Sequence, residues 1–211
     1  MKTDDLIDML AAGADTPPSR RTGFLPLLAG GLLASFALLL VLLGVRPNLL
    51  EELTWPAFWS KLVFSLALAA AGWVAVRRLS IPGARTNALP FYLGAPVLAI
   101  WLTSAVVLSQ AAPETRAALF WGSTWRYCPV LIALISIPLF ASMLAIMRSR
   151  TPTRLRTAGA AAGFAAGAAA AAVYCLHCPE LSIVFVGFWY LLGMLIPAAV
   201  GALIGPRVLA W

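Results

Sequence analysis

Six long apolar runs divide the chain, and shorter stretches that carry most of the charged residues separate them. A bilayer core of about 30 Å requires about 20 apolar residues in a helix, and the runs are close to that length. Their apolar positions are continuous rather than alternating, which predicts helices and not the strands of a membrane barrel. The predicted spans are Phe24–Gly44, Phe58–Val76, Pro90–Leu108, Cys128–Met147, Thr157–Tyr174 and Leu181–Ile204.

This pattern predicts an all-α membrane protein with two parts. Residues 1–23 form a polar arm, and residues 24–211 form a six-transmembrane-helix bundle. The composition agrees, because hydrophobic residues make up 62% of the chain and charged residues only 11%, with a mean hydropathy of +0.91. A soluble domain carries roughly 25% charged residues. Most of the connecting loops are short, so consecutive helices are expected to be antiparallel.

The basic residues predict the orientation of the bundle. If the N-terminus is cytoplasmic, eleven of the 15 basic residues lie on that side, and the other side holds only Arg46, Lys61, Arg116 and Arg126. Cytoplasmic loops carry an excess of Lys and Arg. We therefore expect an inner-membrane protein with both termini in the cytoplasm and the loop after residue 174 in the periplasm. Orientation and attraction to anionic lipid explain the net charge of +7, so no direct contact with nucleic acid is expected.

Polar groups are rare inside the six runs. No Asp, Glu, Arg or His lies in the middle of a run, and Lys61 lies near the end of one, where its side chain is expected to snorkel outward. Ion-coupled transporters usually require an ionisable group inside the membrane, so transport is not favoured. The long loop 110–127 is expected to begin a short helix at Pro113 and to rest its aromatic side chains on the membrane surface.

A stripe of small residues marks the fifth run. Gly159, Gly163 and Gly167 recur every four residues, and Ala171 and Cys175 continue the same face. Small residues at this spacing allow the backbones of two membrane helices to approach closely. The stripe therefore predicts a helix-packing surface, and it predicts that Cys175 faces the interior of the bundle.

The N-terminal arm begins with "MKTDDLIDML", which is typical of a short amphipathic helix. Thr3 can cap the helix, and acidic residues follow in the first turn, where the helix dipole favours anions. The apolar residues fall on one face. Two interpretations remain open: a frayed tail, or a helix that folds onto a partner protein. The candidate partner-binding residues are Asp4, Asp5, Leu6, Ile7, Met9 and Leu10.

Three features together resemble a known family. They are the start "MKTDDLIDML" before six apolar spans, a Cys-Pro pair at Cys128, and "HCPE" at residues 177–180 before the sixth span. This combination resembles the NrsF-type anti-sigma factors, which are bacterial inner-membrane proteins. The resemblance implies that the arm holds a sigma factor of the extracytoplasmic-function class at the membrane and that the bundle releases it under stress.

The resemblance also assigns roles to particular residues. Asp4, Asp5, Leu6 and Ile7 match the N-terminal pattern of the family, and Cys128 and Cys178 match its two characteristic cysteines, whereas Cys175 is additional. The resemblance implies a regulatory protein rather than an enzyme, with no cofactor.

The reactive side chains gather at one predicted membrane level. Cys128 opens the fourth span, and Cys175, His177 and Cys178 follow the fifth, so all four are expected on the periplasmic side. Three kinds of chemistry remain open at this point. Cys128 and Cys178 could form a sensing pair, with Cys175 and His177 as accessory groups. Cys175 and Cys178 could form the redox centre of a thiol–disulfide oxidoreductase. All four side chains could bind zinc or Cu(I) in a metal-binding membrane protein.

Overall fold

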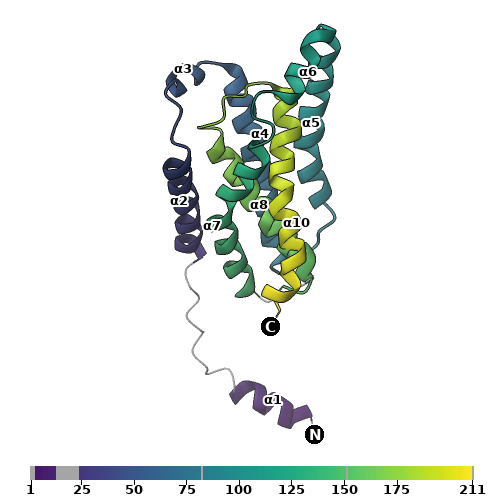
Figure 1. The fold of residues 1–211 in the computed structure, drawn as a ribbon. Coiled ribbons are helices and arrows are strands. Elements are labelled where there is room, and N and C mark those ends of the chain that lie inside the picture. Colours follow the sequence, from purple (N-terminus) through teal and green to yellow (C-terminus); the bar gives the residue numbers. More distant parts are fainter. Residues whose placement is uncertain (1–2, 13–23, 82, 151, 211) are drawn as a thin grey trace.

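The computed structural model describes residues 3–12, 24–81, 83–150 and 152–210, and this part of the chain contains helices and no strand (Figure 1). Six helices are long and apolar enough to cross a membrane, and they coincide with the six predicted runs. The elements are α1 (Thr3–Ala12), α2 (Phe24–Leu42), α3 (Leu49–Glu52), α4 (Pro56–Leu79), α5 (Leu89–Gln110), α6 (Pro113–Trp121), α7 (Cys128–Arg148), α8 (Leu155–Tyr174), α9 (Ile183–Phe185), the π-helix η2 (Val186–Tyr190) and α10 (Leu191–Val208).

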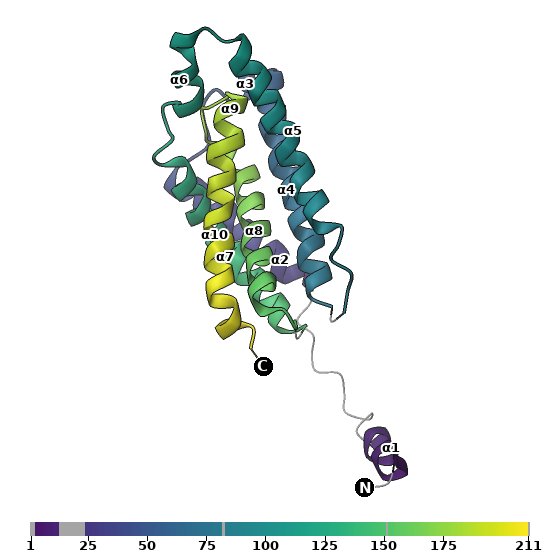
Figure 2. The same cartoon turned by 90° about the vertical axis from the view of Figure 1, so that its right-hand side faces the viewer.

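The long helices lie side by side in one bundle, with α8 at its centre (Figures 1 and 2). Helix α8 packs against α4, α7 and α10, whereas α2 packs mainly against α7 and α5 mainly against α4. This order follows from side-chain size, because α8 consists largely of Ala and Gly and admits close neighbours on several sides. In the most apolar stretch of each helix, 61% of α8 is buried but only 17% of α2.

The glycine stripe of α8 faces α10. A Cβ atom on Gly159 would collide with the carbonyl oxygen of Gly201, and one on Gly163 would collide with that of Pro197. A Cβ on Gly167 would lie 2.9 Å from the Cα of Met194. The two backbones therefore touch along this seam, and the absence of side chains on the glycines is what allows it.

Proline positions explain where several helices begin. Pro56, Pro90, Pro113 and Pro129 occupy the first turns of α4, α5, α6 and α7, where a missing backbone N–H costs nothing. The short helix predicted to begin at Pro113 in the loop 110–127 is present as α6. Its aromatic residues pack against η2, and Trp189 Nε1 donates a hydrogen bond to the carbonyl oxygen of Phe120 at 2.9 Å.

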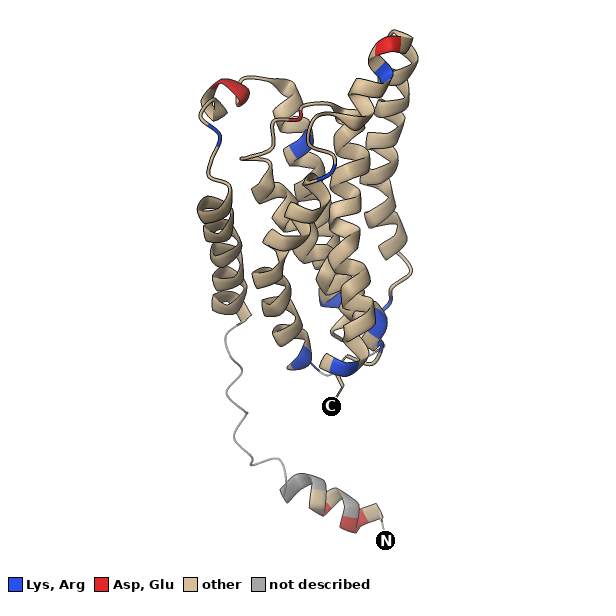
Figure 3. Cartoon of the chain, viewed as in Figure 1, with Lys and Arg blue, Asp and Glu red and all other residues tan. Residues whose placement is uncertain are grey.

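The bundle has two ends that differ in charge. We call the end where α2 begins at Phe24 the arm end, and the opposite end, which holds the three cysteines, the thiol end. Figure 3 shows only basic segments at the arm end of the bundle and both signs of charge at the thiol end. Glu51, Glu52, Glu114 and Glu180 all lie at the thiol end. Among the described residues of the bundle, the arm end holds Arg77, Arg78, Arg85, Arg148, Arg150, Arg154, Arg156 and Arg207.

Candidate functional site: a buried thiol cluster

Three cysteines from two separate parts of the chain meet at the thiol end. Cys128 is the first residue of α7, and Cys175 and Cys178 follow the last turn of α8. All three are free thiols, and all are buried: Cys128 and Cys178 have no exposed surface and Cys175 has 1%. Cys175 thus faces the interior, as the stripe on α8 predicts. The loop after residue 174 is closed over its cysteines rather than open to solvent.

The thiols of Cys128 and Cys178 interact directly. The hydrogen bond from Cys128 is the largest of several effects that lower the pKa of Cys178 to about 6, against the opposing effect of its burial. Cys175 behaves in the opposite way, because desolvation by burial dominates and raises its pKa to about 11. The two shifts run in opposite directions, which makes Cys178 the more acidic of these two thiols. The more acidic sulfur has a second sulfur, that of Cys128, beside it.

Lys61 takes part in this cluster, and the prediction that its side chain reaches outward was wrong. The residue is 1% exposed, and its Nζ donates a hydrogen bond of 2.8 Å to the carbonyl oxygen of Cys178. A longer contact of 3.5 Å joins it to the carbonyl oxygen of Glu180. The side chain turns inward because the turn after α8 offers two backbone acceptors inside the bundle.

His177 lies beside the thiols but bonds elsewhere. Its Nδ1 is 3.1 Å from the carbonyl oxygen of Gly44, which immediately follows the end of α2. A carbonyl oxygen only accepts, so Nδ1 carries the proton in this contact. The backbone N–H of Arg46 also donates to the carbonyl oxygen of Leu176 at 3.3 Å. These two bonds join the cysteine loop to the segment after α2.

The candidate metal ligands do not form a metal site in the described part of the chain. No group of three or more His, Cys, Asp or Glu side chains is arranged there to hold an ion. The thiols of Cys128 and Cys178 come together, whereas His177 bonds to Gly44. The arrangement suits thiol chemistry between two sulfur atoms better than coordination by four side chains.

Glu180 fixes the loop 110–127 over the cluster. Its Oε1 accepts hydrogen bonds from the backbone N–H and hydroxyl of Ser123, both at 2.7 Å, and from the same two groups of Thr124 at 3.2 and 3.4 Å. Gly122 makes this approach possible, because its φ is +54° and a Cβ there would lie 2.8 Å from the Glu180 carboxyl group. Carboxylate hydrogen bonds of this kind are among the stronger ones in proteins.

Sequence reasoning did not identify Lys61 and Tyr190 as members of the cluster. The hydroxyl of Tyr190 is buried beside the sulfur atoms of Cys175 and Cys178, and its hydrogen bonding lowers the pKa of both thiols. Lys61 gave a usable signal, since it is a charged residue inside an apolar run. Tyr190 gave none, because its position depends on how η2 packs against α8.

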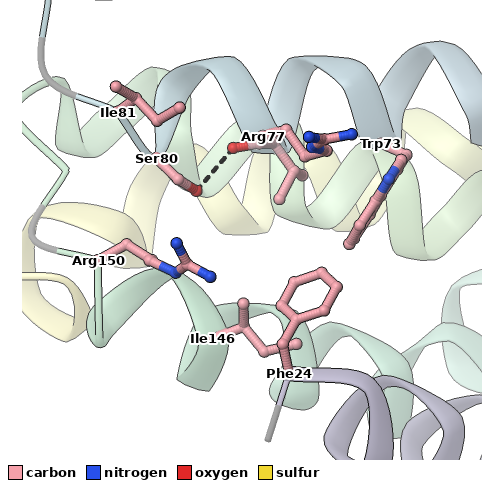
Figure 4. A pocket seen from close by; sticks show the side chains of 8 residues that line it. Phe24, Trp73, Arg77, Ser80, Ile81, Ile146 and Arg150 are labelled. Carbon is pink, nitrogen blue, oxygen red and sulfur yellow. Dashed lines mark hydrogen bonds between the residues drawn. The ribbon is translucent and has the colours of Figure 1, made fainter. Parts of the chain in front are cut away.

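A small cavity lies at the arm end, far from the thiols (Figure 4). Its volume is about 350 Å³, and it lies between the first turn of α2 and the C-terminal parts of α4 and α7. The rings of Phe24 and Trp73 form one wall, with centroids 5.0 Å apart, and the guanidinium group of Arg150 lies at the other side. The lining residues are Phe24, Trp73, Val76, Arg77, Ser80, Ile81, Ile146 and Arg150.

The arm contains the helix that its sequence predicts, α1. Asp4, Asp5, Ile7 and Met9 are exposed on it, and Ile7 and Met9 expose 57% and 67% of their surfaces. The side chains of Leu6 and Leu10 lie outside the described residues, as do residues 13–23 between the helix and the bundle.

Comparison with known proteins decides the family. Residues 10–211 match the family described as "NrsF: Negative regulator of sigma F". The chain belongs to the NrsF family. It is 53% identical to the probable anti-sigma-F factor NrsF of Azospira oryzae and 37% identical to the anti-sigma-F factor NrsF of Caulobacter vibrioides, in each case over the full length of both proteins. No solved structure matches the chain. The resemblance seen in the sequence is confirmed, and NrsF proteins are named for regulation rather than catalysis.

Proposed function

We propose that this NrsF protein is an anti-sigma factor that holds sigma F, as a sigma factor of the extracytoplasmic-function class, at the bacterial inner membrane. Full-length similarity to two anti-sigma-F factors carries the proposal. Six membrane-length helices support attachment to the membrane, and the basic arm end supports a cytoplasmic position for that end and for both termini. The thiol end then faces the periplasm.

The arm is the part proposed to bind the sigma factor. Helix α1 exposes the apolar side chains of Ile7 and Met9 and carries Asp4 and Asp5 in its first turn, so a partner surface with apolar and basic side chains would fit it. Leu6 and Leu10 belong to the apolar residues that the sequence predicts for partner binding. Burying two apolar side chains contributes about 3–6 kcal/mol, or at least a hundredfold in affinity.

The thiol cluster is proposed to detect the stress. Cys128 and Cys178 are already in contact, so a two-electron oxidant can convert them to a disulfide by taking two electrons while two protons leave. A soft metal ion could bind the same sulfur atoms. Cys175, with its raised pKa, is expected to be an accessory thiol. Either change would alter the distance between the first turn of α7 and the last turn of α8.

Helix α2 is proposed to carry the signal to the arm. The C-terminal end of α2 lies just before Gly44, which His177 contacts. Its N-terminal end, at Phe24, directly follows the arm in the sequence. Only 17% of its apolar stretch is buried, which supports movement at a lower cost than for the central helices. If only about 1% of the protein is in the sigma-releasing conformation before stress, the change at the thiols must stabilise that conformation by about 5.5 kcal/mol to bring it to about 99%.

Co-purification of sigma F with the full-length protein tests the binding part of the proposal. Sigma F should co-purify from solubilised membranes with the wild type. With the Ile7→Ala, Met9→Ala double variant its affinity should fall at least a hundredfold, so that it no longer co-purifies. Val41→Ala is the matched control, because Val41 is an apolar residue of α2 that is 83% exposed. Equal recovery of sigma F with the double variant would leave the arm without its proposed role.

Transcription from a sigma F-dependent promoter tests the sensing part. Cys128→Ser and Cys178→Ser should each abolish induction by a thiol oxidant or a soft metal ion, and Cys175→Ser should have a smaller effect. Protein abundance in the membrane serves as the control. Normal induction in the Cys128→Ser, Cys178→Ser double variant would rule out thiol sensing even if the arm binds sigma F.

A further inference from the structure

The cavity at the arm end is lined by two arginines that have no partner in the described part of the chain. Arg77 belongs to the last turn of α4, and Arg150 follows the end of α7. Neither guanidinium group forms a hydrogen bond or an ion pair with a described residue. Arg78, by contrast, donates a hydrogen bond of 3.0 Å to the carbonyl oxygen of Arg85. The donors of Arg77 and Arg150 are therefore available to a ligand.

The charge around the cavity is all of one sign. The four glutamates lie at the thiol end, and the described aspartates, Asp4, Asp5 and Asp8, belong to the arm helix α1. Among the described residues of the bundle, the arm end thus holds arginines and no acid. Cations that are not balanced by protein carboxylates, at the end of membrane helices, attract the anionic groups of lipids.

The walls of the cavity set a second condition on the ligand, because they are apolar and aromatic. Phe24 and Trp73 are in ring contact, Ile146 lies beside Phe24, and Arg150 lies across the cavity from Trp73 (Figure 4). The indole N–H of Trp73 makes no hydrogen bond with a described residue, so it is a third free donor. The volume of about 350 Å³ lies within the usual range of ligand pockets. A fitting ligand combines an anionic group with apolar surface.

We propose that this cavity binds the headgroup of an anionic phospholipid, with its phosphate group held by Arg77 and Arg150 and its glycerol and first acyl carbons against the aromatic wall. The site lies at the ends of three membrane-length helices, α2, α4 and α7, which is the level of the lipid phosphates. Guanidinium groups bind phosphate through two parallel hydrogen bonds, and basic pockets between membrane helices bind anionic headgroups.

Arginines at helix ends also have a more general use, since they orient a membrane protein and complement the helix dipole. Arg148 fits this description, because it is exposed in the last turn of α7 and does not line the cavity. Arg77 and Arg150 differ from it in sharing one cavity, which also contains the free indole N–H of Trp73. A headgroup with choline fits less well, because its ammonium group would meet arginines and no carboxylate.

A bound headgroup would connect three helices at the arm end. Phe24 is the first residue of α2, Trp73 and Arg77 belong to α4, and Arg150 follows α7. The lipid would therefore hold the start of α2 against the other two helices. If the proposed route of the signal through α2 holds, an occupied site opposes the release of sigma F. The inner leaflet as the source of the lipid likewise rests on the proposed orientation, whereas the binding itself rests on neither.

Native mass spectrometry of the full-length protein in a non-ionic detergent tests the site, with dioleoyl phosphatidylglycerol as the probe. The Arg77→Gln, Arg150→Gln double variant should bind this lipid about tenfold more weakly or worse, because two charge-assisted interactions are lost. Trp73→Phe keeps an aromatic ring without the N–H and should weaken binding about fivefold.

The matched control is the Arg148→Gln, Arg156→Gln double variant. It loses the same charge from exposed positions that do not line the cavity, so its lipid affinity should stay close to that of the wild type. The thermal transition of each variant in lipid-free detergent checks folding. An equal loss of affinity in both double variants would overturn the site in favour of a general attraction to a basic surface.

Two further probes identify what the site recognises. Dioleoyl phosphatidylcholine has the same acyl chains and no net charge, and it should bind more weakly than phosphatidylglycerol. Equal binding of these two lipids to the wild type would overturn the inference without any variant. Inorganic phosphate lacks the apolar part of the ligand and should also bind more weakly. Phosphate that binds as tightly as phosphatidylglycerol, with the same dependence on Arg77 and Arg150, would replace the lipid by a soluble anion.

Release of sigma F in vesicles separates this inference from the proposed function. Phosphatidylglycerol added to phosphatidylcholine vesicles should slow oxidant-induced release from the wild type but not from the Arg77→Gln, Arg150→Gln variant. If the lipid binds as expected and release does not depend on it, the site stands and its effect on α2 fails. If sigma F never co-purifies, mass spectrometry still decides whether the cavity binds the lipid.

Discussion

Helices α8 and α2 both run from the arm end to the thiol end, yet they are built differently. Helix α8 lies between three neighbours, and its glycines touch the backbone of α10. Helix α2 lies at the edge of the bundle and buries only Gly31, Ser35 and Leu39. At the thiol end the two are joined through the His177–Gly44 contact, whereas at the arm end a cavity lies beside the Phe24–Trp73 contact, between the start of α2 and helices α4 and α7.

This difference separates a fixed frame from an element that can move. Backbone contact at several glycines leaves α8 no room to shift without breaking the seam with α10. Helix α2 has one narrow packing face and a hollow beside its first turn, so a small displacement loses few contacts. Changes in α8 should therefore affect folding, and changes in α2 should affect signalling with little loss of stability.

The largest effect is expected at the α8–α10 seam. Gly163→Leu should prevent stable folding, because the new side chain meets the backbone of Pro197, which cannot yield as a side chain can. Gly30→Leu on α2 is the matched control, since a Cβ at Gly30 has no atom within 4 Å. The yield of folded protein and its thermal transition in detergent measure the difference. Similar losses in both variants would contradict the assignment of α8 as the frame.

A smaller but clear loss of stability is expected at Glu180. Glu180→Ala removes the acceptor for two backbone N–H groups and two hydroxyls, which should cost about 2 kcal/mol and loosen the loop 110–127. The loosened loop should also speed the reaction of Cys178 with a small alkylating reagent. Glu180→Gln keeps an oxygen acceptor without the charge and should lie between the two. Peptide mass spectrometry measures the rate of Cys178 alkylation in a Cys175→Ser background. An unchanged rate in Glu180→Ala would show that the loop 110–127 does not cover the Cys178 thiol.

His177 should affect the connection between the frame and α2 more than the stability of either. His177→Ala removes one hydrogen bond to Gly44, worth about 1 kcal/mol, and should reduce oxidant-induced release of sigma F about fivefold while basal binding persists. His177→Asn can donate from a similar position and should retain most of the response. Release measured from purified protein in vesicles checks the order. Equal release from the Ala variant and the wild type would remove His177 from the proposed route.

The smallest change in stability is expected at the start of α2. Phe24→Ala removes one ring of the Phe24–Trp73 pair beside the cavity and should cost about 1 kcal/mol or less. It should nevertheless raise basal sigma F-dependent transcription, because it weakens the arm end of α2. Leu25→Ala is the control, since Leu25 is 72% exposed. Equal basal transcription in both variants would mean that the cavity has no part in signalling.

Much of the fold follows from the sequence because its signals are local. Continuous apolar runs of membrane length predicted the six helices, and Pro113 marked the start of the short helix α6. The four-residue spacing of Gly159, Gly163 and Gly167 identified a packing face, although not α10 as the helix that fills it. The arm helix α1 was visible in ten residues, and whether it binds sigma F stays a prediction.

The site was only partly predictable, because its chemistry depends on which groups meet. The sequence by itself determined that the cysteines lie at one end of a helical bundle, since that follows from chain direction alone. Only the tertiary structure decided that the thiols are buried, that Lys61 turns inward to the carbonyl oxygen of Cys178, and that His177 contacts Gly44. These contacts join residues over a hundred positions apart, as the 117 between Lys61 and Cys178 show. The spacing of residues along the chain cannot encode such contacts. The protonation state of each buried group depends on them as well, because desolvation and neighbouring charges act only after the helices have packed.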